Sequence, residues 1–321
     1  MFKWLRTPRA EPPPEAPPAR DLSRLLHRLE WVVRRKLDGQ IQGPHRNWLR
    51  GSGVELADLR EYRPEDDVRR IDWPTTARLQ TPYVRDYHED REMTAWLVLD
   101  LSASMAVDSV GRSKQEVVLT LCGLLTRLLH RQGNPVGLLL HNGSQPGFSL
   151  RLPPRVGRTA LLRLLQAIAE PHTAREGHAT DLGLLLRETA ANLKRRCTVI
   201  LVSDFYASND WSRALTQLAQ RHDVVAVRVR DPIELNWPRS GMMWLRDAET
   251  QACVWVDSDD AAFAQRFAQA AEAREAALRQ AFVRAGVDAL EVRTDEPVED
   301  ALLAFLRQRT PRPVAQATGG A

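Results

Sequence analysis

Cysteine is scarce in this 321-residue chain, which contains only Cys122, Cys197 and Cys253. The three residues are far apart and odd in number, which argues against a framework of disulfide bonds. The sequence also has neither the C-x-x-C nor the H-E-x-x-H spacing of common zinc sites. We therefore expect reduced cysteines that pack as small residues of the core.

Long hydrophobic runs and concentrated positive charge are also missing. No apolar stretch approaches the ~18 residues that a membrane span needs, and the basic start of the chain reaches its prolines without the apolar segment of a secretory signal. The net charge is +4 and only 6% of the residues are aromatic. The arginines are scattered, whereas a nucleic-acid surface needs a basic stripe. We expect a cytoplasmic protein with no integral membrane segment and no nucleic-acid partner.

The sequence motifs of several enzyme classes are missing as well. There is no G-x-S-x-G elbow for a hydrolase serine. The stretch "GRSKQE" lacks the spacing of a phosphate-binding loop, and "RGSGVEL" does not follow a strand as a dinucleotide-binding glycine motif would. A phosphatase of the haloacid-dehalogenase type would carry aspartate two residues after Asp100, where this chain has Ser102. These absences predict a protein that is not an enzyme.

The composition divides the chain into segments. Residues 1–20 are rich in proline, which predicts a disordered tail. Residues 21–39 have leucine and valine at helical spacing, which predicts an amphipathic helix. Residues 40–92 are polar and charged, and residues 311–321 are expected to form a flexible tail.

Strands and helices are expected to alternate from residue 93 onward. Apolar runs such as "AWLVLD", "VGLLLH", "TVILVSD" and "VVAVRV" predict buried strands separated by helices. The stretch "FSLRL" predicts a possible edge strand, and residues 242–256 predict a hairpin. The pattern predicts an α/β domain over residues 93–310, Rossmann-like, with a doubly wound and mostly parallel sheet. The helix and the charged segment would extend it at the N-terminal side.

Oxygen-bearing side chains follow the predicted strands where a doubly wound sheet binds its ligands. Asp100, Ser102 and Ser104 come at the end of the first strand, Asp204 ends another, and Thr180 lies in a loop between them. Hydroxyls and carboxylates without histidine or cysteine suit a hard cation, Mg²⁺ first and Mn²⁺ next. Each piece taken alone also fits helix capping or turn formation. Together they predict a metal site.

This arrangement resembles the metal-ion-dependent adhesion site of von Willebrand factor type A domains. In that family an Asp-x-Ser-x-Ser loop, a threonine loop and a distant aspartate bind a divalent cation. The resemblance implies that Ser102, Ser104 and Thr180 contact the metal through their hydroxyls. It also implies that Asp100 and Asp204 bind the metal directly or through water.

Three neighbouring residues bear on the same site. Phe205 follows Asp204 where the wider family often has glycine, which implies a different loop shape. His178 and Asp181 flank Thr180 and are candidates for the surroundings of the direct ligands. They are also the nearest candidates along the sequence for a general base, which leaves open a metal-dependent hydrolase as the alternative function.

The charged segment carries a second resemblance, to the N-terminal signature of a bacterial family known as domain of unknown function 58. The resemblance extends over roughly residues 43–310. The signature positions singled out in this chain are Arg60, Tyr62, Asp66, Asp67, Arg69, Asp72, Trp73, Arg78 and Arg85. Members of that family often accompany an AAA+ ATPase of the MoxR type. The resemblance therefore implies a chaperone-like role with such an ATPase and an unknown protein client as partners.

Two interpretations of the charged segment stay open. Arginines surround the Asp66–Asp67 pair, and such pairing favours ionised carboxylates held by bidentate bridges. One interpretation is a network of ion pairs and hydrogen bonds that holds residues 43–92 on the sheet. The other is a surface for a partner protein.

Overall fold

The computed structural model describes residues 55–63, 71–88, 93–106, 111–170, 181–207, 210–235, 240–246 and 253–308, with positions 28, 29, 32, 66, 68 and 109. The predicted tails, residues 1–20 and 311–321, lie outside these ranges. None of the helices in the part described is long and apolar enough to cross a membrane.

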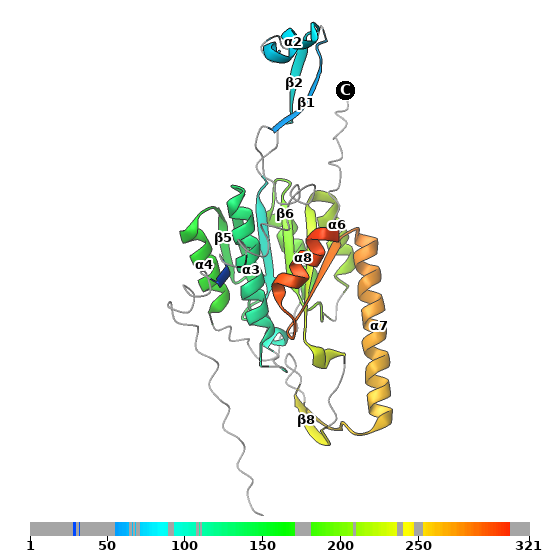
Figure 1. The fold of residues 1–321 in the computed structure, drawn as a ribbon. Coiled ribbons are helices and arrows are strands. Elements are labelled where there is room, and N and C mark those ends of the chain that lie inside the picture. The colour runs from blue at the N-terminus through cyan, green and yellow to red at the C-terminus, as the bar shows by residue number, and fades with distance from the viewer. Residues whose placement is uncertain are drawn as a thin grey trace, which may run out of the picture.

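The main body is built on a six-stranded sheet with the order β10-β7-β6-β3-β4-β5 (Figure 1). Neighbouring strands are parallel except for β5, which runs antiparallel to β4 at one edge. The strands are β3 (Ala95–Asp100), β4 (Val136–His141), β5 (Leu150–Arg155), β6 (Thr198–Ser203), β7 (Asp223–Arg230) and β10 (Asp288–Arg293). The predicted α/β chain with a mostly parallel sheet is confirmed.

The chain reverses its direction across the sheet between β3 and β6. It first adds β4 and β5 on one side of β3, and then returns to add β6, β7 and β10 on the other side. A reversal of this kind opens a crevice beyond the carboxyl ends of the two central strands, where open α/β sheets bind ligands. Asp100 and Ser203 are the last residues of these two strands.

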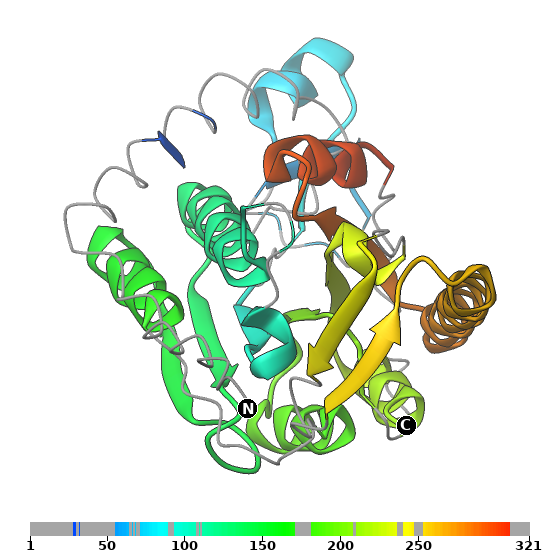
Figure 2. The ribbon, with the colours of Figure 1, turned by 90° about the horizontal axis from the view of Figure 1, so that it is seen from below.

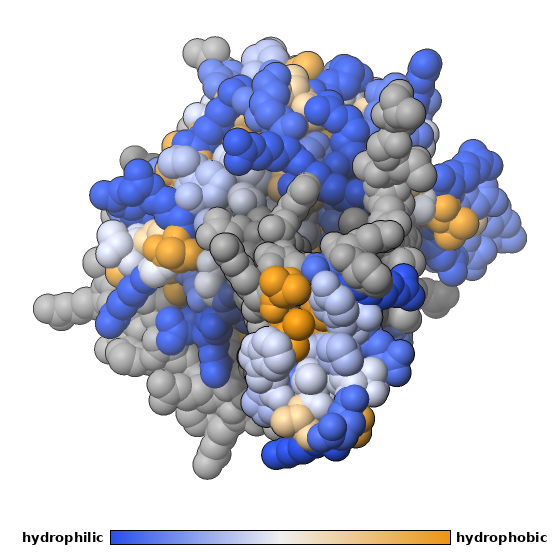
Figure 3. All heavy atoms as spheres, turned by 90° about the horizontal axis from the view of Figure 1, so that it is seen from above, coloured by the Kyte–Doolittle hydropathy of each residue, from blue (hydrophilic) through white to orange (hydrophobic). Residues whose placement is uncertain are grey.

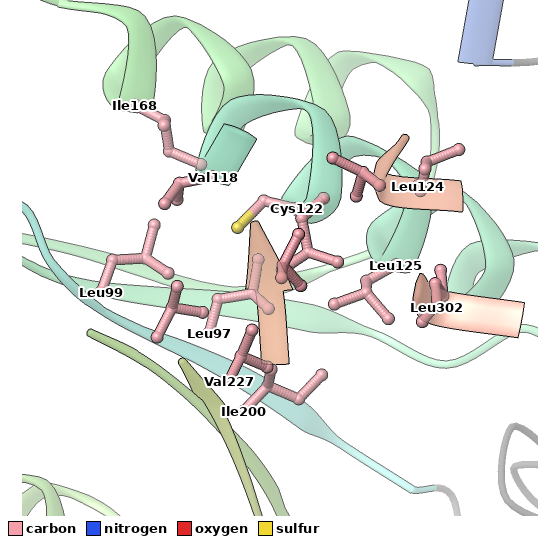
Figure 4. Packing of buried hydrophobic residues seen from close by; sticks show 14 of the residues in the cluster. Leu97, Leu99, Val118, Cys122, Leu124, Leu125, Ile168, Ile200, Val227 and Leu302 are labelled. Carbon is pink, nitrogen blue, oxygen red and sulfur yellow. The ribbon is translucent and has the colours of Figure 1, made fainter. Parts of the chain in front are cut away.

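Helices cover both faces of the sheet (Figure 2). One face packs against α3 (Lys114–Arg131), α4 (Arg158–Ala169) and α8 (Val298–Gln308). The other packs against α5 (Leu182–Asn192), α6 (Ser212–Arg221) and α7 (Ala261–Ala285). Because side chains alternate along a strand, Leu97 and Leu99 enter the first core and Val98 enters the second. Figure 4 shows Val118 and Cys122 of α3 facing Leu97 and Leu99.

The predicted N-terminal helix, residues 21–39, is described at three positions. Arg28, Leu29 and Val32 are helical, and the last two are buried in the core on the α3 face. Gly123 of α3 permits this contact, because a Cβ atom there would lie 2.5 Å from the Leu29 Cδ1 atom.

Two smaller sheets lie outside the main one. The hairpin of β8 (Met242–Arg246) and β9 (Cys253–Asp257) occupies the segment where the sequence predicts one. In the charged segment, β1 (Glu55–Glu61) pairs antiparallel with β2 (Tyr83–His88), and α2 (Trp73–Leu79) lies between them in sequence.

Figure 1 shows β1, β2 and α2 beyond one end of the six-stranded sheet. Viewed from that end, the surface is mainly hydrophilic with small, scattered hydrophobic patches (Figure 3). Hydrogen bonds within this unit include Tyr62 N–H to Pro82 O and Asp72 N–H to Tyr83 O. The predicted docking of residues 40–92 on the core stays a prediction, since residues 40–54 and 89–92 lie outside the described ranges.

Leu29 provides a test of the helix that precedes the charged segment. Its side chain is 1% exposed, so Leu29→Ala should lower the free energy of unfolding by about 2–5 kcal/mol. Denaturant unfolding measures this change. The matched control is Val283→Ala, whose side chain is 80% exposed on α7 and should change stability by less than about 0.5 kcal/mol. Equal effects of the two substitutions would show that the N-terminal helix does not pack on α3.

Candidate functional site

Four polar residues from two strands lie buried at the point where the sheet reverses. Asp100 ends β3 and is 2% exposed, and Ser102 follows it at 5%. Ser203 ends β6 and Asp204 follows it, at 1% and 2% exposure. Buried polar groups need partners, because an unpaired one loses its hydration without compensation. Each of these carboxylates has such partners.

Asp100 joins the two central strands at their ends. Its Oδ2 atom accepts a hydrogen bond of 2.9 Å from the Ser203 hydroxyl, and its Oδ1 atom accepts one of 3.2 Å from the Ser102 backbone N–H. Burial raises the pKa of Asp100, and the nearby Asp204 carboxylate raises it further. The two carboxylates are therefore close enough to repel each other.

Ser102 and Ser104 bring two hydroxyls together beside these carboxylates. Their Oγ atoms lie 3.3 Å apart. A single helical turn, η4 (Ala103–Ala106), produces this approach, with the Met105 N–H donating to the Ser102 carbonyl at 3.0 Å. Spacing i, i+2 on a strand would have left both hydroxyls on one face but about 7 Å apart.

Asp204 is held by a backbone turn and by a buried lysine. Its Oδ1 atom accepts from the Tyr206 N–H at 3.1 Å, and its Oδ2 atom accepts from Lys114 Nζ at 3.1 Å. Phe205, between Asp204 and Tyr206, has a φ of 59°. This value lies in the left-handed region that glycine adopts without strain. The loop thus keeps a backbone compatible with glycine. The Ser203 hydroxyl accepts from the Phe205 N–H at 2.9 Å, which helps to hold this conformation.

Lys114 is the first residue of α3 and is 1% exposed. Its ammonium group also contacts Glu234 Oε1, at the end of the short helix η5 (Pro232–Glu234). Burial acts to lower the pKa of Lys114, but the carboxylates of Asp204 and Glu234 outweigh burial and raise it. The lysine is therefore charged at neutral pH. Burial raises the pKa of Glu234 despite this pairing.

The carboxylates around the site share a small number of cations. Asp204 and Glu234 both contact the ammonium group of Lys114, and Arg228 and His141 act on Glu234 and Asp100. One further acceptor, Glu234 Oε2, is buried without a hydrogen-bond partner in the part of the chain described. The repulsion between Asp100 and Asp204 and the spare oxygen of Glu234 both favour an additional cation.

Asp231 connects the loops around the site through hydrogen bonds. It is fully buried and accepts from Thr294 Oγ1 at 3.0 Å, from the Ile233 N–H at 3.1 Å and from both the N–H and the hydroxyl of Ser109. These bonds connect the loop after η4, the start of η5 and the end of β10. Burial alone would raise the pKa of Asp231, but the hydrogen bonds lower it overall.

The structure brings together some of the residues predicted to bind a metal. The structure brings Asp100, Ser102, Ser104 and Asp204 to one end of the sheet, with Ser102 and Ser104 in contact. Thr180 and His178 lie outside the described residues. Asp181 caps α5, with its Oδ1 atom accepting from the Leu184 N–H at 2.7 Å, so its place near a metal stays a prediction.

The signature residues of the charged segment are spread over several environments. Asp72 is buried and caps α2, Tyr62 and Asp66 are half-buried, and Trp73 and Arg78 are exposed. Arg60 lies in β1 and Arg85 in β2, whose backbones are described, and Asp67 and Arg69 lie outside the described residues.

Four residues near the site were missed by the sequence analysis: Ser203, Lys114, Glu234 and Asp231. Lys114 did leave a signal, because a lysine in the first turn of a helix opposes the helix dipole unless acidic groups compensate it. In the part of the chain described, no group of three or more His, Cys, Asp or Glu side chains is placed to hold a metal ion. A metal here would therefore depend on the serine hydroxyls as well as on the carboxylates.

Asp231→Asn tests whether the ionised Asp231 carboxylate stabilises these loops. A carboxyl whose pKa is lowered by folding stabilises the protein above its unfolded pKa, and this contribution disappears as the pH falls through the folded pKa. Asp231→Asn should therefore cost about 1–3 kcal/mol near neutral pH, and the cost should shrink in acid. Unfolding curves at several pH values measure it, with the exposed Asp259→Asn as control. A cost independent of pH would contradict the role of the ionised carboxylate.

Comparisons with known proteins place the chain among bacterial relatives. Uncharacterized proteins of Mycobacterium tuberculosis and Mycobacterium bovis are each 35% identical over 288 residues, which cover 90% of this chain and 90% of the relative. An uncharacterized protein of Mycobacterium avium is 32% identical over 159 residues, covering 50% of this chain and 94% of its own length.

Two solved structures from Bacteroides also match. A conserved hypothetical protein BatB of Bacteroides thetaiotaomicron has 15% identity and a TM-score of 0.42, covering 67% of this chain and 97% of its own. An aerotolerance-related membrane protein of Bacteroides fragilis has 16% identity and a TM-score of 0.43, with the same coverage.

The family assignment rests on two of these findings together. The family model described as "Protein of unknown function DUF58" matches residues 58–277, and the mycobacterial relatives extend the similarity over 90% of the chain. The chain belongs to the DUF58 family.

Proposed function

We propose that this chain is a metal-dependent protein-interaction module and not an enzyme. In this proposal Mg²⁺ or Mn²⁺ binds beyond the carboxyl ends of β3 and β6 and offers an open coordination position to a carboxylate of a partner protein. The observation that carries the proposal is the gathering of Asp100, Ser102, Ser104 and Asp204 at the reversal point of the sheet, where Asp100 and Asp204 repel each other.

The donor set fits a hard divalent cation. Every candidate ligand is an oxygen, which Mg²⁺ and Mn²⁺ prefer. The Ser102 and Ser104 hydroxyls lie together, and neutral ligands of this kind leave most of the metal's charge uncompensated. The carboxylates of Asp100 and Asp204 each accept hydrogen bonds from the protein already, and each oxygen keeps a lone pair for the metal or for a bound water.

The fold that we propose in detail is that of a von Willebrand factor type A domain, with a metal-ion-dependent adhesion site. The Asp-x-Ser-x-Ser loop at the end of β3 and Asp204 directly after β6 support it. Thr180 would supply the third hydroxyl. The positive φ of Phe205 also supports it, because the chain keeps a glycine-like backbone where the resembled family often has glycine.

The partners that we propose are an AAA+ ATPase of the MoxR type and a client protein that it helps to mature or assemble. This choice rests on the resemblance to a family whose members often accompany such an ATPase. An acidic residue of the partner would fill the open coordination position, since the metal keeps positive charge that a neutral side chain would not satisfy.

A metal-dependent hydrolase is the alternative from the same residues. It needs a general base beside the metal that is not committed to the fold. Asp181 is occupied in capping α5, and both oxygens of Asp204 accept protein hydrogen bonds. Among the described residues these contacts favour binding over turnover, while the other candidate base, His178, lies outside the described ranges. Assays of phosphoester and peptide hydrolysis with Mg²⁺ distinguish the two functions.

Asp100→Ala tests the metal site directly. Titration calorimetry with Mn²⁺ should show one site in the unsubstituted protein and a loss of at least about tenfold in affinity in Asp100→Ala, because a carboxylate near the cation is removed. Ser144→Ala is the control, since this hydroxyl follows the neighbouring strand β4 and bonds to Asn142 at 2.6 Å. Equal binding by all three proteins would rule out the site.

Ser104→Ala tests the link between metal and partner. Its side chain is half-buried on η4, so the substitution should leave the fold intact and weaken capture of the MoxR-type ATPase. Capture should also fall when a chelator removes Mg²⁺. A pull-down with Mg²⁺, with chelator and with Ser104→Ala compares the three conditions. Undiminished capture in all of them would move partner recognition away from the metal.

A further inference from the structure

Lys114 is a positively charged side chain in a position that disfavours positive charge. It begins α3, where the helix dipole is unfavourable to positive charge, and it is 1% exposed. A buried ammonium group is stabilised only by good opposite charges. Asp204 Oδ2 at 3.1 Å and Glu234 Oε1 provide them.

The surroundings hold the ammonium group against Asp204. Its Nζ atom lies 5.6 Å from the centre of the Tyr206 ring. On the same ring lies the Arg274 guanidinium, 4.5 Å from the centre, which also donates to the Tyr206 hydroxyl at 2.9 Å. Glu234 is fixed in turn, because η5 begins at Asp231 and its many hydrogen bonds. The lysine is thus confined by charge and by packing.

We infer that Lys114 is a positioning residue of the proposed metal site, an internal cation that holds Asp204 at a distance from the metal and limits metal affinity in the free protein. The inference rests on the proposed function and concerns the regulation of that site. It follows from the hydrogen bond between Lys114 and Asp204. This bond occupies an oxygen of one of the two carboxylates that would hold the metal.

The charge of Lys114 acts on a bound metal as well as on Asp204. An ammonium group 3.1 Å from Asp204 Oδ2 repels a cation that binds to the same carboxylate. Without Lys114 the carboxylates of Asp204 and Glu234 would both act on the metal unopposed by this ammonium group and would repel a partner's carboxylate. The lysine therefore makes metal binding weaker and leaves the bound metal better able to accept an anionic ligand.

Metal titration of substituted proteins tests the inference. Lys114→Met should bind Mn²⁺ more tightly than the unsubstituted protein, by about tenfold or more, because a nearby positive charge is removed. A purely structural lysine predicts the reverse, since damage to the site weakens binding. Thermal unfolding gives a second readout. Lys114→Met should melt lower without metal and gain more from Mn²⁺ than the unsubstituted protein does.

Lys114→Met removes the ammonium partner of Asp204 and Glu234 and is expected to destabilise the fold without metal. The double variant Lys114→Met/Glu234→Gln removes one charge of each sign and keeps the net charge of the site. It should also bind Mn²⁺ more tightly than the unsubstituted protein, whereas Glu234→Gln alone should bind it more weakly.

The outcomes separate the inference from the proposed function. If the unsubstituted protein binds Mn²⁺ in a manner that Asp100→Ala abolishes, and the folded double variant binds it no more tightly, the inference about Lys114 is overturned while the metal site stands. If neither the unsubstituted protein nor the double variant binds Mn²⁺, the proposed metal site fails and the inference with it. Tighter binding by the double variant, lost again when Asp100→Ala is added, supports both.

Discussion

The hydrogen bond from the Ser203 hydroxyl to Asp100 is the contact on which the site depends. It joins the ends of β3 and β6 at 2.9 Å, where the two halves of the sheet diverge. The same hydroxyl accepts from the Phe205 N–H and so sets the turn that aims Asp204 toward Lys114. One small side chain therefore fixes the relative position of two buried carboxylates that repel each other.

Two buried carboxylates of this chain, Asp231 and Asp204, are stabilised in different ways. Asp231 is surrounded by hydroxyl and backbone donors, which satisfy it completely and tie three loops together. Asp204 depends on a lysine that it shares with Glu234, and Glu234 keeps an unpartnered oxygen. Fully satisfied groups make rigid supports, whereas a partly satisfied cluster of like charges is what an added cation stabilises.

The sequence predicted those features that depend on local pattern. Strands buried on both faces are continuous apolar runs, so β3, β4, β6 and β7 lie where they were expected, and Asp100 and Asp204 follow from the strand ends. The edge strand β5 was harder because Pro153 and Pro154 interrupt it, which only an edge tolerates. The hairpin of β1 and β2 was missed because its charged residues hide the strand pattern. Lys114 and Glu234 are 120 positions apart, and only the fold brings them together.

The structure also bears on the two interpretations of the charged segment. Asp72 is buried for a local reason, since its Oδ1 atom accepts from the Thr75 N–H and caps α2, with proline following in the first turn. Trp73 begins the same helix and is 66% exposed, and α2 has no buried residue. A network that fastened this helix to the sheet would bury its largest apolar side chain, because that burial supplies most of the stabilisation. An exposed tryptophan and an exposed Arg78 on the same helix instead favour a surface for a partner protein.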